Sequence, residues 1–399
     1  MPDSRPGYHS NRFERKRAQP GFTFQHDQLF LYFRVHQQVC TLNHCSQQNQ
    51  NEINIDSTMS IKLTYFSTIL LIILLSAPNL QAQDEPLGDR MKEKLKSEEF
   101  NVTFLMQTFG NVTFTDREFN DSNGFELDAN RLGFRGVLDG NFSYRLQLEY
   151  TDSPTILDAR LGYTFSDQLE VQVGSFKPRL SADLDPNPGI TDFIDRARQV
   201  GATMNNREIG ITLLGESSGW GYAFGMYNGN RLQNENDGRF LYTGRLSYTF
   251  GEDGNSLEFA LNGAFNQTEN ERVGKSGLTS AGDRELYGIY AQFEKNPLFG
   301  TFEYLQSSFD AVELLAEETI SGFFATLGTN ISERDQVIAR WDHLEYDVIN
   351  QESDLLILAF KRKVTSLISI HINGLALLGS EEFNGENQFG VKTNLQFQF

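Results

Sequence analysis

Charged side chains alternate with large apolar residues along several stretches of this sequence. Between positions 142 and 151, Arg145 and Glu149 occupy alternate positions among aromatic and aliphatic residues. The C-terminal stretch 388–399 repeats this order and carries Lys392 on its polar side. Such spacing gathers guanidinium, ammonium and carboxylate groups on one face, where their fields attract or repel ions. The chemistry expected from this pattern is therefore ion binding and selection rather than bond breaking.

The longest polar stretch, residues 178–206, also concentrates charge. Its charged residues, with those at its two ends, are Lys177, Arg179, Asp183, Asp185, Asp192, Asp195, Arg196, Arg198 and Arg207. The spacing Asp183-x-Asp185-x-Asn187 is similar to that of an oxygen-ligand calcium loop. Prolines interrupt the motif and its glycine is out of register. We interpret the stretch as a structural loop and predict no metal site, although calcium binding stays open.

The remaining candidates for catalysis are few. After residue 58 the only histidines are His343 and His371, which lie in separate stretches. The sequence has neither a nucleophile elbow nor a phosphate-binding Walker loop. A net charge of −19, from 34 Lys and Arg against 53 Asp and Glu, excludes a simple nucleic-acid binder. We predict that the protein is not an enzyme and has no cofactor.

The N-terminal part of the chain contains a second potential start. A new methionine, Met59, is followed by Lys62, an apolar run from Tyr65 to Ala77 and the small-residue exit Leu80-Gln81-Ala82. This order predicts a secretory signal peptide over 59–82, and its apolar run is too short to span a bilayer about 30 Å thick as a helix. Residues 1–58, which contain the only cysteines, are either an upstream extension from a wrongly chosen start codon or a disordered segment. Residues 83–97 are polar, and we expect a short exposed segment there.

From residue 98 to the C-terminus, apolar residues recur at a period of two, which is the period of β-strands. About sixteen stretches follow this period: 98–114, 124–138, 141–151, 155–165, 168–177, 207–216, 219–229, 239–251, 255–268, 283–295, 299–309, 318–330, 334–346, 353–363, 366–379 and 386–399. The stretch 318–330 and the Leu-rich run 355–360 fit the alternation least well.

The connections between these strands alternate between short and long. Asp139-Gly140, Ser166-Asp167 and Ser217-Ser218 are tight turns, whereas 115–123 and 178–206 are long connections. A soluble sandwich also alternates, but short turns at one rim and long loops at the other are typical of a transmembrane barrel. The mean hydropathy of −0.42 excludes a helical membrane bundle but not a barrel, in which only every second residue faces lipid. The sequence therefore predicts an all-β, transmembrane antiparallel β-barrel of about sixteen strands over residues 98–399.

If the aromatic and aliphatic face contacts outer-membrane lipid, the opposite face lines a water-filled lumen. The alternation then places these residues on the lumen wall: Arg131, Arg135, Arg145, Arg160, Arg245, Arg340, Lys392, His371, Glu149, Asp158, Glu170, Glu258, Glu303 and Asp342. Two interpretations stay open for each charged residue. It contributes to a field that selects solutes, or it forms a salt bridge that makes the wall rigid. The loop 178–206 is too long for a rim hairpin, so we expect it to fold inward and narrow the lumen.

Short motifs in order along the chain resemble the phosphate-selective porin O/P family of outer-membrane porins. They are RLGFRG (131–136), YRLQLEY (144–150), LDAR (157–160), VGSFKP (173–178), REIGI (207–211), FGMYNG (224–229) and the terminal Phe399. The resemblance implies a homotrimer of sixteen-stranded barrels with a constricting third extracellular loop. It also implies that the barrel-assembly machinery reads Phe399, and that a ladder of basic residues contacts anions such as phosphate. The matching basic residues are Arg131, Arg135, Arg145, Arg160, Lys177 and Arg179.

The residues themselves leave the ion preference open, because the wall carries acids and bases in comparable numbers. We expect a porin for passive diffusion of small hydrophilic solutes and ions. In that case, charge reversal at Arg179 or Arg198 should alter the ion preference. The alternative is a non-conducting barrel with a structural, adhesive or binding role.

Overall fold

The computed structural model describes residues 95–399 except Glu118, Ser122, Asp167, Asn234, Glu235, Asp237 and Asp253. The predicted extension 1–58, the predicted signal peptide 59–82 and the start of the segment 83–97 lie outside the described residues. Among the described residues, no helix has the length and hydropathy needed to cross a bilayer.

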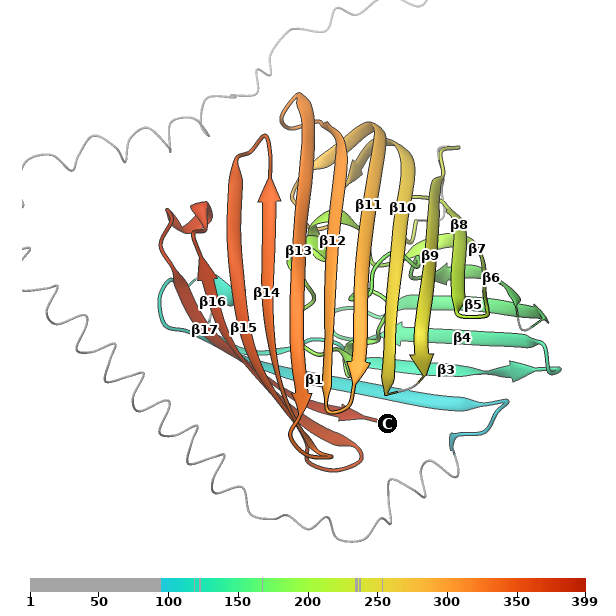
Figure 1. The fold of residues 1–399 in the computed structure, drawn as a ribbon. Coiled ribbons are helices and arrows are strands. Elements are labelled where there is room, and N and C mark those ends of the chain that lie inside the picture. Colours follow the sequence, from blue (N-terminus) through green and yellow to red (C-terminus); the bar gives the residue numbers. More distant parts are fainter. Residues whose placement is uncertain are drawn as a thin grey trace, which may run out of the picture. The chain divides into compact units, whose positions relative to one another are not determined.

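Seventeen described strands form a single antiparallel sheet (Figure 1). They are β1 (Asn101–Thr113), β2 (Gly124–Leu127), β3 (Arg131–Leu138), β4 (Phe142–Glu149), β5 (Thr155–Ser166), β6 (Leu169–Phe176), β7 (Glu208–Ser217), β8 (Trp220–Tyr227), β9 (Leu241–Glu252), β10 (Asn255–Arg272), β11 (Thr279–Lys295), β12 (Leu298–Ala311), β13 (Ala316–Asn330), β14 (Asp335–Tyr346), β15 (Gln351–Lys363), β16 (Ile368–Leu378) and β17 (Gln388–Gln398). The described helical turns are η1 (Phe119–Asp121), η2 (Pro188–Ile190), α4 (Arg198–Thr203) and η3 (Glu381–Phe383).

The sheet closes on itself. Strand β1 pairs with β17 on one edge and with both β2 and β3 on the other. Because β2 and β3 follow each other along the same edge of β1, they are two halves of one interrupted strand, and the barrel has sixteen strands. The predicted fold class is confirmed. Closure leaves no open edge of unpaired backbone groups, which a lipid environment requires.

Tight turns occur at one rim of the barrel. In the β3–β4 turn, Asp139 and Gly140 both have positive φ (49° and 76°), as do Ser218 and Gly219 (52° and 85°) between β7 and β8. Two successive positive φ values define the type I′ turn, whose twist matches that of paired antiparallel strands. The connections at the other rim are mostly longer, and the longest runs from β6 to β7.

One hairpin is longer than the sequence predicts. The expected connection 269–282 is mostly strand, since β10 extends to Arg272 and β11 begins at Thr279. The ladder continues through a bulge between Glu269 and Glu271, and such an extra residue shifts the alternation. Outward polar residues also interrupt the apolar pattern there, so periodicity alone does not detect the extension.

The outer face of the barrel is apolar. Exposed large hydrophobic side chains occur on strands around the ring, including Leu161, Phe224, Leu261, Leu358 and Leu395. Their neighbours of opposite phase are inward and mostly buried. An apolar belt of this extent is an aggregation hazard in water, whereas in a bilayer it contacts acyl chains.

Candidate functional site

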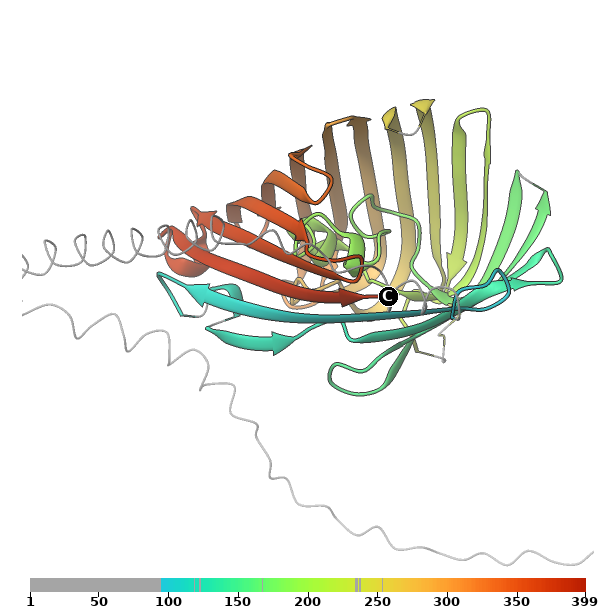
Figure 2. The ribbon, with the colours of Figure 1, turned by 90° about the horizontal axis from the view of Figure 1, so that it is seen from below.

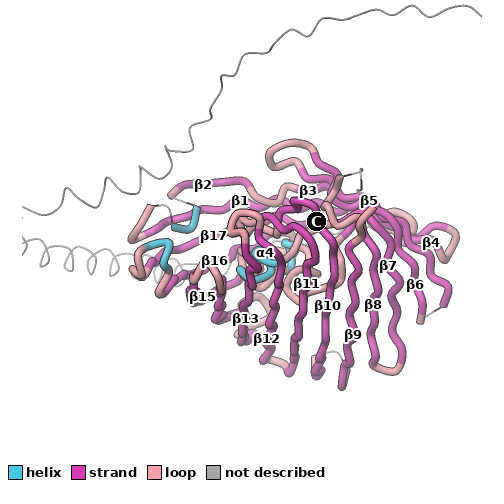
Figure 3. The backbone as a smooth tube through the Cα atoms, turned by 90° about the horizontal axis from the view of Figure 1, so that it is seen from above, coloured by secondary structure: helices cyan, strands magenta, loops and turns pink. Residues whose placement is uncertain are grey.

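The segment 177–207, which we call the inner loop, connects β6 to β7. Figures 2 and 3 show this segment, with α4, inside the ring of strands rather than beyond its rim. Three apolar clusters pack against the inward face of the wall. In one of them, Leu184 and Val200 of the inner loop contact Leu305 of β12 and Phe324 of β13. The inner loop is therefore a packed element and not an extended strap.

A second cluster explains one of the two stretches that fitted the alternation least well, the run 355–360. Phe193 of the inner loop packs on Ile338, Ile357 and Leu375 of β14, β15 and β16. Strand β15 is consequently apolar on both faces, with Ile357 turned inward and Leu358 turned outward. A strand covered on both faces reads as a continuous hydrophobic run instead of an alternation. Strand β13 is also apolar on both faces, because Phe324 packs against the inner loop and Leu327 is turned outward.

Ion pairs join the inner loop to one side of the wall. Three acids of the inner loop contact three wall cations: Asp183 with Arg340 (3.1 Å), Asp185 with Arg245 (2.8 Å) and Asp195 with Lys392 (2.9 Å). The Arg340 guanidinium also lies 4.1 Å from the Phe193 ring centroid and 4.9 Å from that of Phe324. These wall cations, all on β9 to β17, are thus neutralised by the inner loop.

Arg198 makes the opposite kind of contact, in which a cation of the inner loop binds an acid of the wall, Asp342. Its Nε donates to Asp342 Oδ1 at 3.0 Å, and its backbone N–H donates to Asp342 Oδ2 at 2.9 Å. Two further guanidinium nitrogens bind Ser353 Oγ and the carbonyl oxygens of Asp342 and Ser353. The Asp342 side chain is fully buried. Arg198 fastens the start of α4 to β14 and β15.

Further hydrogen bonds complete the attachment of the inner loop. The Glu303 carboxylate on β12 accepts from Ser181 Oγ at 3.1 Å and from the Asp183 backbone N–H at 3.3 Å. On β15, Lys361 Nζ donates to the Thr191 carbonyl at 2.8 Å. At the tip of the inner loop, Gln396 of β17 donates to the Gly189 carbonyl at 2.8 Å. The contacts therefore extend from β12 round to β17.

The opposite side of the wall, β3 to β6, carries an arc of arginines with fewer acids. Arg145 and Arg207 share the single carboxylate of Asp158, at 2.8 Å and 2.7 Å. Arg160 donates to the amide of Gln172 at 3.1 Å. Arg131 is paired with Glu149 at 2.7 Å. Arg135 is exposed and forms no ion pair with any residue that the structure describes.

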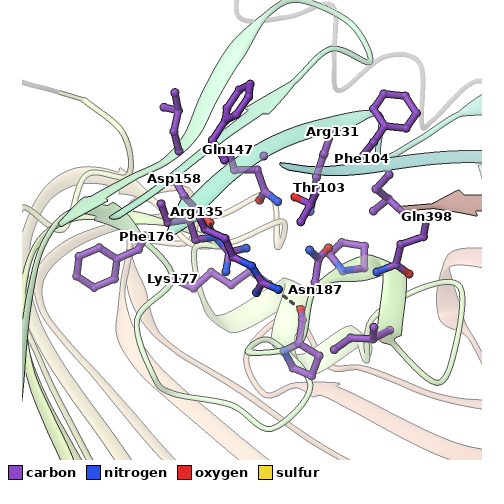
Figure 4. A pocket seen from close by; sticks show the side chains of 18 of the residues that line it. Thr103, Phe104, Arg131, Arg135, Gln147, Asp158, Phe176, Lys177, Asn187 and Gln398 are labelled. Carbon is purple, nitrogen blue, oxygen red and sulfur yellow. Dashed lines mark hydrogen bonds and ion pairs between the residues drawn. The ribbon is translucent and has the colours of Figure 1, made fainter. Parts of the chain in front are cut away.

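A cavity of about 560 Å³ separates this arc from the inner loop (Figure 4). Its charged lining residues are Lys96, Arg131, Arg135, Arg145, Arg160, Lys177, Arg179 and Arg207, with the acids Asp158 and Asp185. A second cavity of about 1020 Å³ lies at the tight-turn rim below β13 to β17, and Ile190 and Leu367 line both cavities. The first cavity is therefore strongly basic, and the two cavities meet near the tip of the inner loop.

Burial alters the ionisation of several groups of the inner loop. Burial, followed by the nearby guanidiniums of Arg196 and Arg207, lowers the pKa of Lys177 to about 6. Its Nζ donates to the carbonyls of Leu184 (2.7 Å) and Pro186 (2.8 Å). Burial likewise raises the pKa of Asp192, and it lowers the pKa of both Arg196 and Arg207. Lys177 therefore titrates near pH 6 and becomes a cation of the cavity only as the pH falls below neutral.

The other residues expected on the lumen wall also point inward. Glu258 accepts from Arg245 at 3.1 Å and from the Tyr290 hydroxyl at 2.8 Å. Glu170 accepts from Gln172 at 2.9 Å. His371 is buried on β16 and lies 3.4 Å from Ser369 Oγ.

Sequence reasoning missed three charged residues that hold the interior together. They are Glu208, Arg284 and Lys361, which contact Asn205, the Thr203 carbonyl and the Thr191 carbonyl. Arg284 and Lys361 share the inward phase with apolar neighbours. Their inward position is therefore not apparent from an alternation in which apolar residues face lipid.

The motif similar to a calcium loop is used differently. Asp183 and Asp185 bind arginines, and the Asn187 side chain accepts from the Gly189 backbone N–H at 3.4 Å. In the described part of the chain, no group of three or more His, Cys, Asp or Glu residues is arranged to hold a metal ion.

A family model and solved structures match this chain. The model described as "Phosphate-selective porin O and P" matches residues 100–294. The anion-selective porin from Comamonas acidovorans has a TM-score of 0.59 at 14% identity, covering 75% of this chain and 99% of that one. OprB of Pseudomonas putida, in a high-pH structure, gives 0.56 at 12% identity over 78% and 96%.

The trimer form of in-vitro folded OmpT from Vibrio cholerae gives a TM-score of 0.56 at 8% identity over 75% and 99% of the two chains. At such low identity these likenesses show the barrel fold. No curated protein sequence matches this chain.

Proposed function

Because the model of the phosphate-selective porin O and P family matches residues 100–294, we propose that the outer-membrane barrel of this chain is a water-filled channel for passive diffusion of small hydrophilic solutes, with a preference for anions. Barrels of sixteen strands are wide enough to leave an aqueous lumen. The family match supports an outer-membrane channel, and the preference for anions is argued from the cavity.

The charge of the 560 Å³ cavity carries this proposal. The inner loop neutralises Arg245, Arg340 and Lys392 on β9 to β17, whereas the arginines of β3 to β5 share few acids. The wall carries acids and bases in comparable numbers, but the positive charge that is not neutralised lies on one side of the lumen. A low-dielectric wall lined by one sign of charge concentrates counter-ions, so the cavity should hold anions at higher local concentration than cations.

The inner loop takes the role of constriction in this proposal. Its contacts with β12 to β17 hold it against one side of the lumen and direct solutes along the arginine arc. Arg179 is the loop residue best placed to act on solutes, since it lines the cavity and is 42% exposed. Arg198 is paired with the buried Asp342. Its role is therefore to position the inner loop rather than to contact solutes.

Assembly and export complete the proposal. A homotrimer is supported by the family and by the trimeric form of the similar OmpT structure. Export through the signal peptide 59–82 is supported by the sequence pattern of that segment. Phe399, whose ring lies 4.8 Å from Lys96 Nζ at the end of the barrel wall, is the proposed recognition signal for the barrel-assembly machinery.

Recording from single channels in a planar bilayer tests this function. Protein purified from outer membranes should give discrete ohmic current steps that increase with bulk salt. Replacing chloride by a bulky organic anion should lower the steps more than replacing potassium by a bulky organic cation. A heat-modifiable, folded barrel that gives no steps would establish the non-conducting alternative.

A further inference from the structure

We propose that the basic cavity selects organic anions that carry an apolar body, such as aromatic carboxylates, in preference to small inorganic anions. This inference rests on the proposed channel function and specifies its solutes. It assigns the anionic group of the solute to the arginines of β3 to β5. It assigns the apolar body to Ile190 and the neighbouring apolar residues of the inner loop tip.

The size of the cavity is the first observation. Its volume of about 560 Å³ falls within the roughly 300–1,000 Å³ of pockets that bury organic ligands. A small inorganic anion occupies a minor part of such a space. The remainder then stays filled with water unless the solute has a body of its own.

The second observation is the position of Ile190. Most other large apolar side chains of the inner loop are buried, with Leu184, Phe193 and Val200 all fully inaccessible. Ile190 is 63% exposed, although it belongs to the same packed element. Because it lines both cavities, its apolar surface faces the space through which a solute passes. Ile190 therefore adds little to the packing of the inner loop, and its surface is free to contact a solute.

The third observation is the separation of apolar and basic groups. Pro186 and Pro188 of the inner loop and Leu367 of the β15–β16 turn line the cavity together with Ile190. The arginines come from different elements, the strands β3 to β5. In Figure 4 the loop tip around Asn187 lies across the cavity from Arg131 and Gln147. A solute with a charged end and an apolar end can contact both sides at once.

Block of the chloride current by benzoate and by acetate tests this inference, since the two share one carboxylate and differ in the ring. In single-channel recordings of the wild-type protein, benzoate should block at about ten-fold lower concentration than acetate. In the Ile190→Ser variant this ratio should fall toward one. In Ile190→Leu the benzoate preference should persist.

The control is Leu315→Asn, which removes a more exposed apolar side chain (92%) in the β12–β13 turn, outside both cavities. It should leave the ratio of benzoate to acetate block unchanged. Equal block by the two acids, or an unchanged ratio in Ile190→Ser, would overturn the inference while leaving the channel intact. Loss of the proposed function itself is distinguishable, because it appears as absent or cation-selective current before any blocker is added.

Discussion

At the residue scale, the effect of each charged side chain on ions in the lumen depends on whether an oppositely charged residue is paired with it. The sequence identifies the inward charged residues by their phase, and the structure places them on the inner side of the wall. It cannot identify their partners, since Asp183, Asp185 and Asp195 come from the inner loop while their cations come from strands far away in sequence. A balance of acids and bases read from the sequence therefore conceals an arc of arginines with a surplus of positive charge.

Arg135 should contribute directly to anion preference, because it is exposed in the cavity and has no acidic partner among the described residues. Arg135→Gln is expected to lower the ratio of chloride to potassium permeability. The matched control is Arg272→Gln, which removes an exposed arginine at the end of β10. Equal permeability ratios for the two variants would contradict this role.

Lys177 should make the ion preference depend on pH. Its pKa is lowered to about 6, so it is mostly neutral at pH 7.5 and becomes protonated as the pH falls. Each added proton places a positive charge in the cavity, and the chloride-to-potassium permeability ratio should rise between pH 7.5 and 5.5. In Lys177→Met, the part of this rise in the permeability ratio that comes from Lys177 should be absent. Only the change caused by protonation of the lumen acids should remain. Identical pH profiles for the two proteins would refute the assignment.

At the scale of elements, the period of two predicts the strands well and their ends less well. All sixteen predicted stretches coincide with strands, with β2 and β3 counted as one. Strands β13 and β15 fitted poorly because they carry apolar residues on both faces, lipid on one side and the inner loop on the other. The path of the inner loop depends on long-range packing of Phe193 and Leu184, which local periodicity does not encode.

The attachment of the inner loop by Arg198 should be energetically important. Arg198→Gln leaves the Asp342 carboxylate fully buried without its cation, and breaking such a pair costs about 3–5 kcal/mol. We expect this variant to have a lower midpoint temperature for loss of the folded band, measured by electrophoresis of samples preheated to a series of temperatures. We also expect noisier single-channel currents.

Arg239→Gln provides the comparison for this variant. It breaks an exposed pair with Glu269 at 3.5 Å, for which about 0–1 kcal/mol is expected. Similar midpoints for the two variants would argue against a fastened inner loop.

At the scale of the whole molecule, the chain end closes the barrel. The Phe399 backbone N–H donates to the Phe104 carbonyl at 2.9 Å, and the Phe104 N–H donates to the Phe399 carbonyl at 3.1 Å. Phe399→Ala keeps these backbone bonds but removes the ring. If the ring is a recognition signal, the variant should refold normally in detergent and reach the outer membrane in lower yield. Equal losses in both assays would instead indicate a purely structural role.

The central claim is that an inner loop neutralises one side of the lumen and leaves an arginine-lined path along the other. The reversal potential of single channels in a potassium chloride gradient at pH 7.5 tests it most directly. The account predicts a reversal potential of the sign given by chloride as the more permeant ion, shifting toward zero as salt increases and screens the arginines. A reversal potential of the opposite sign would show that the acids control the lumen and would contradict the account.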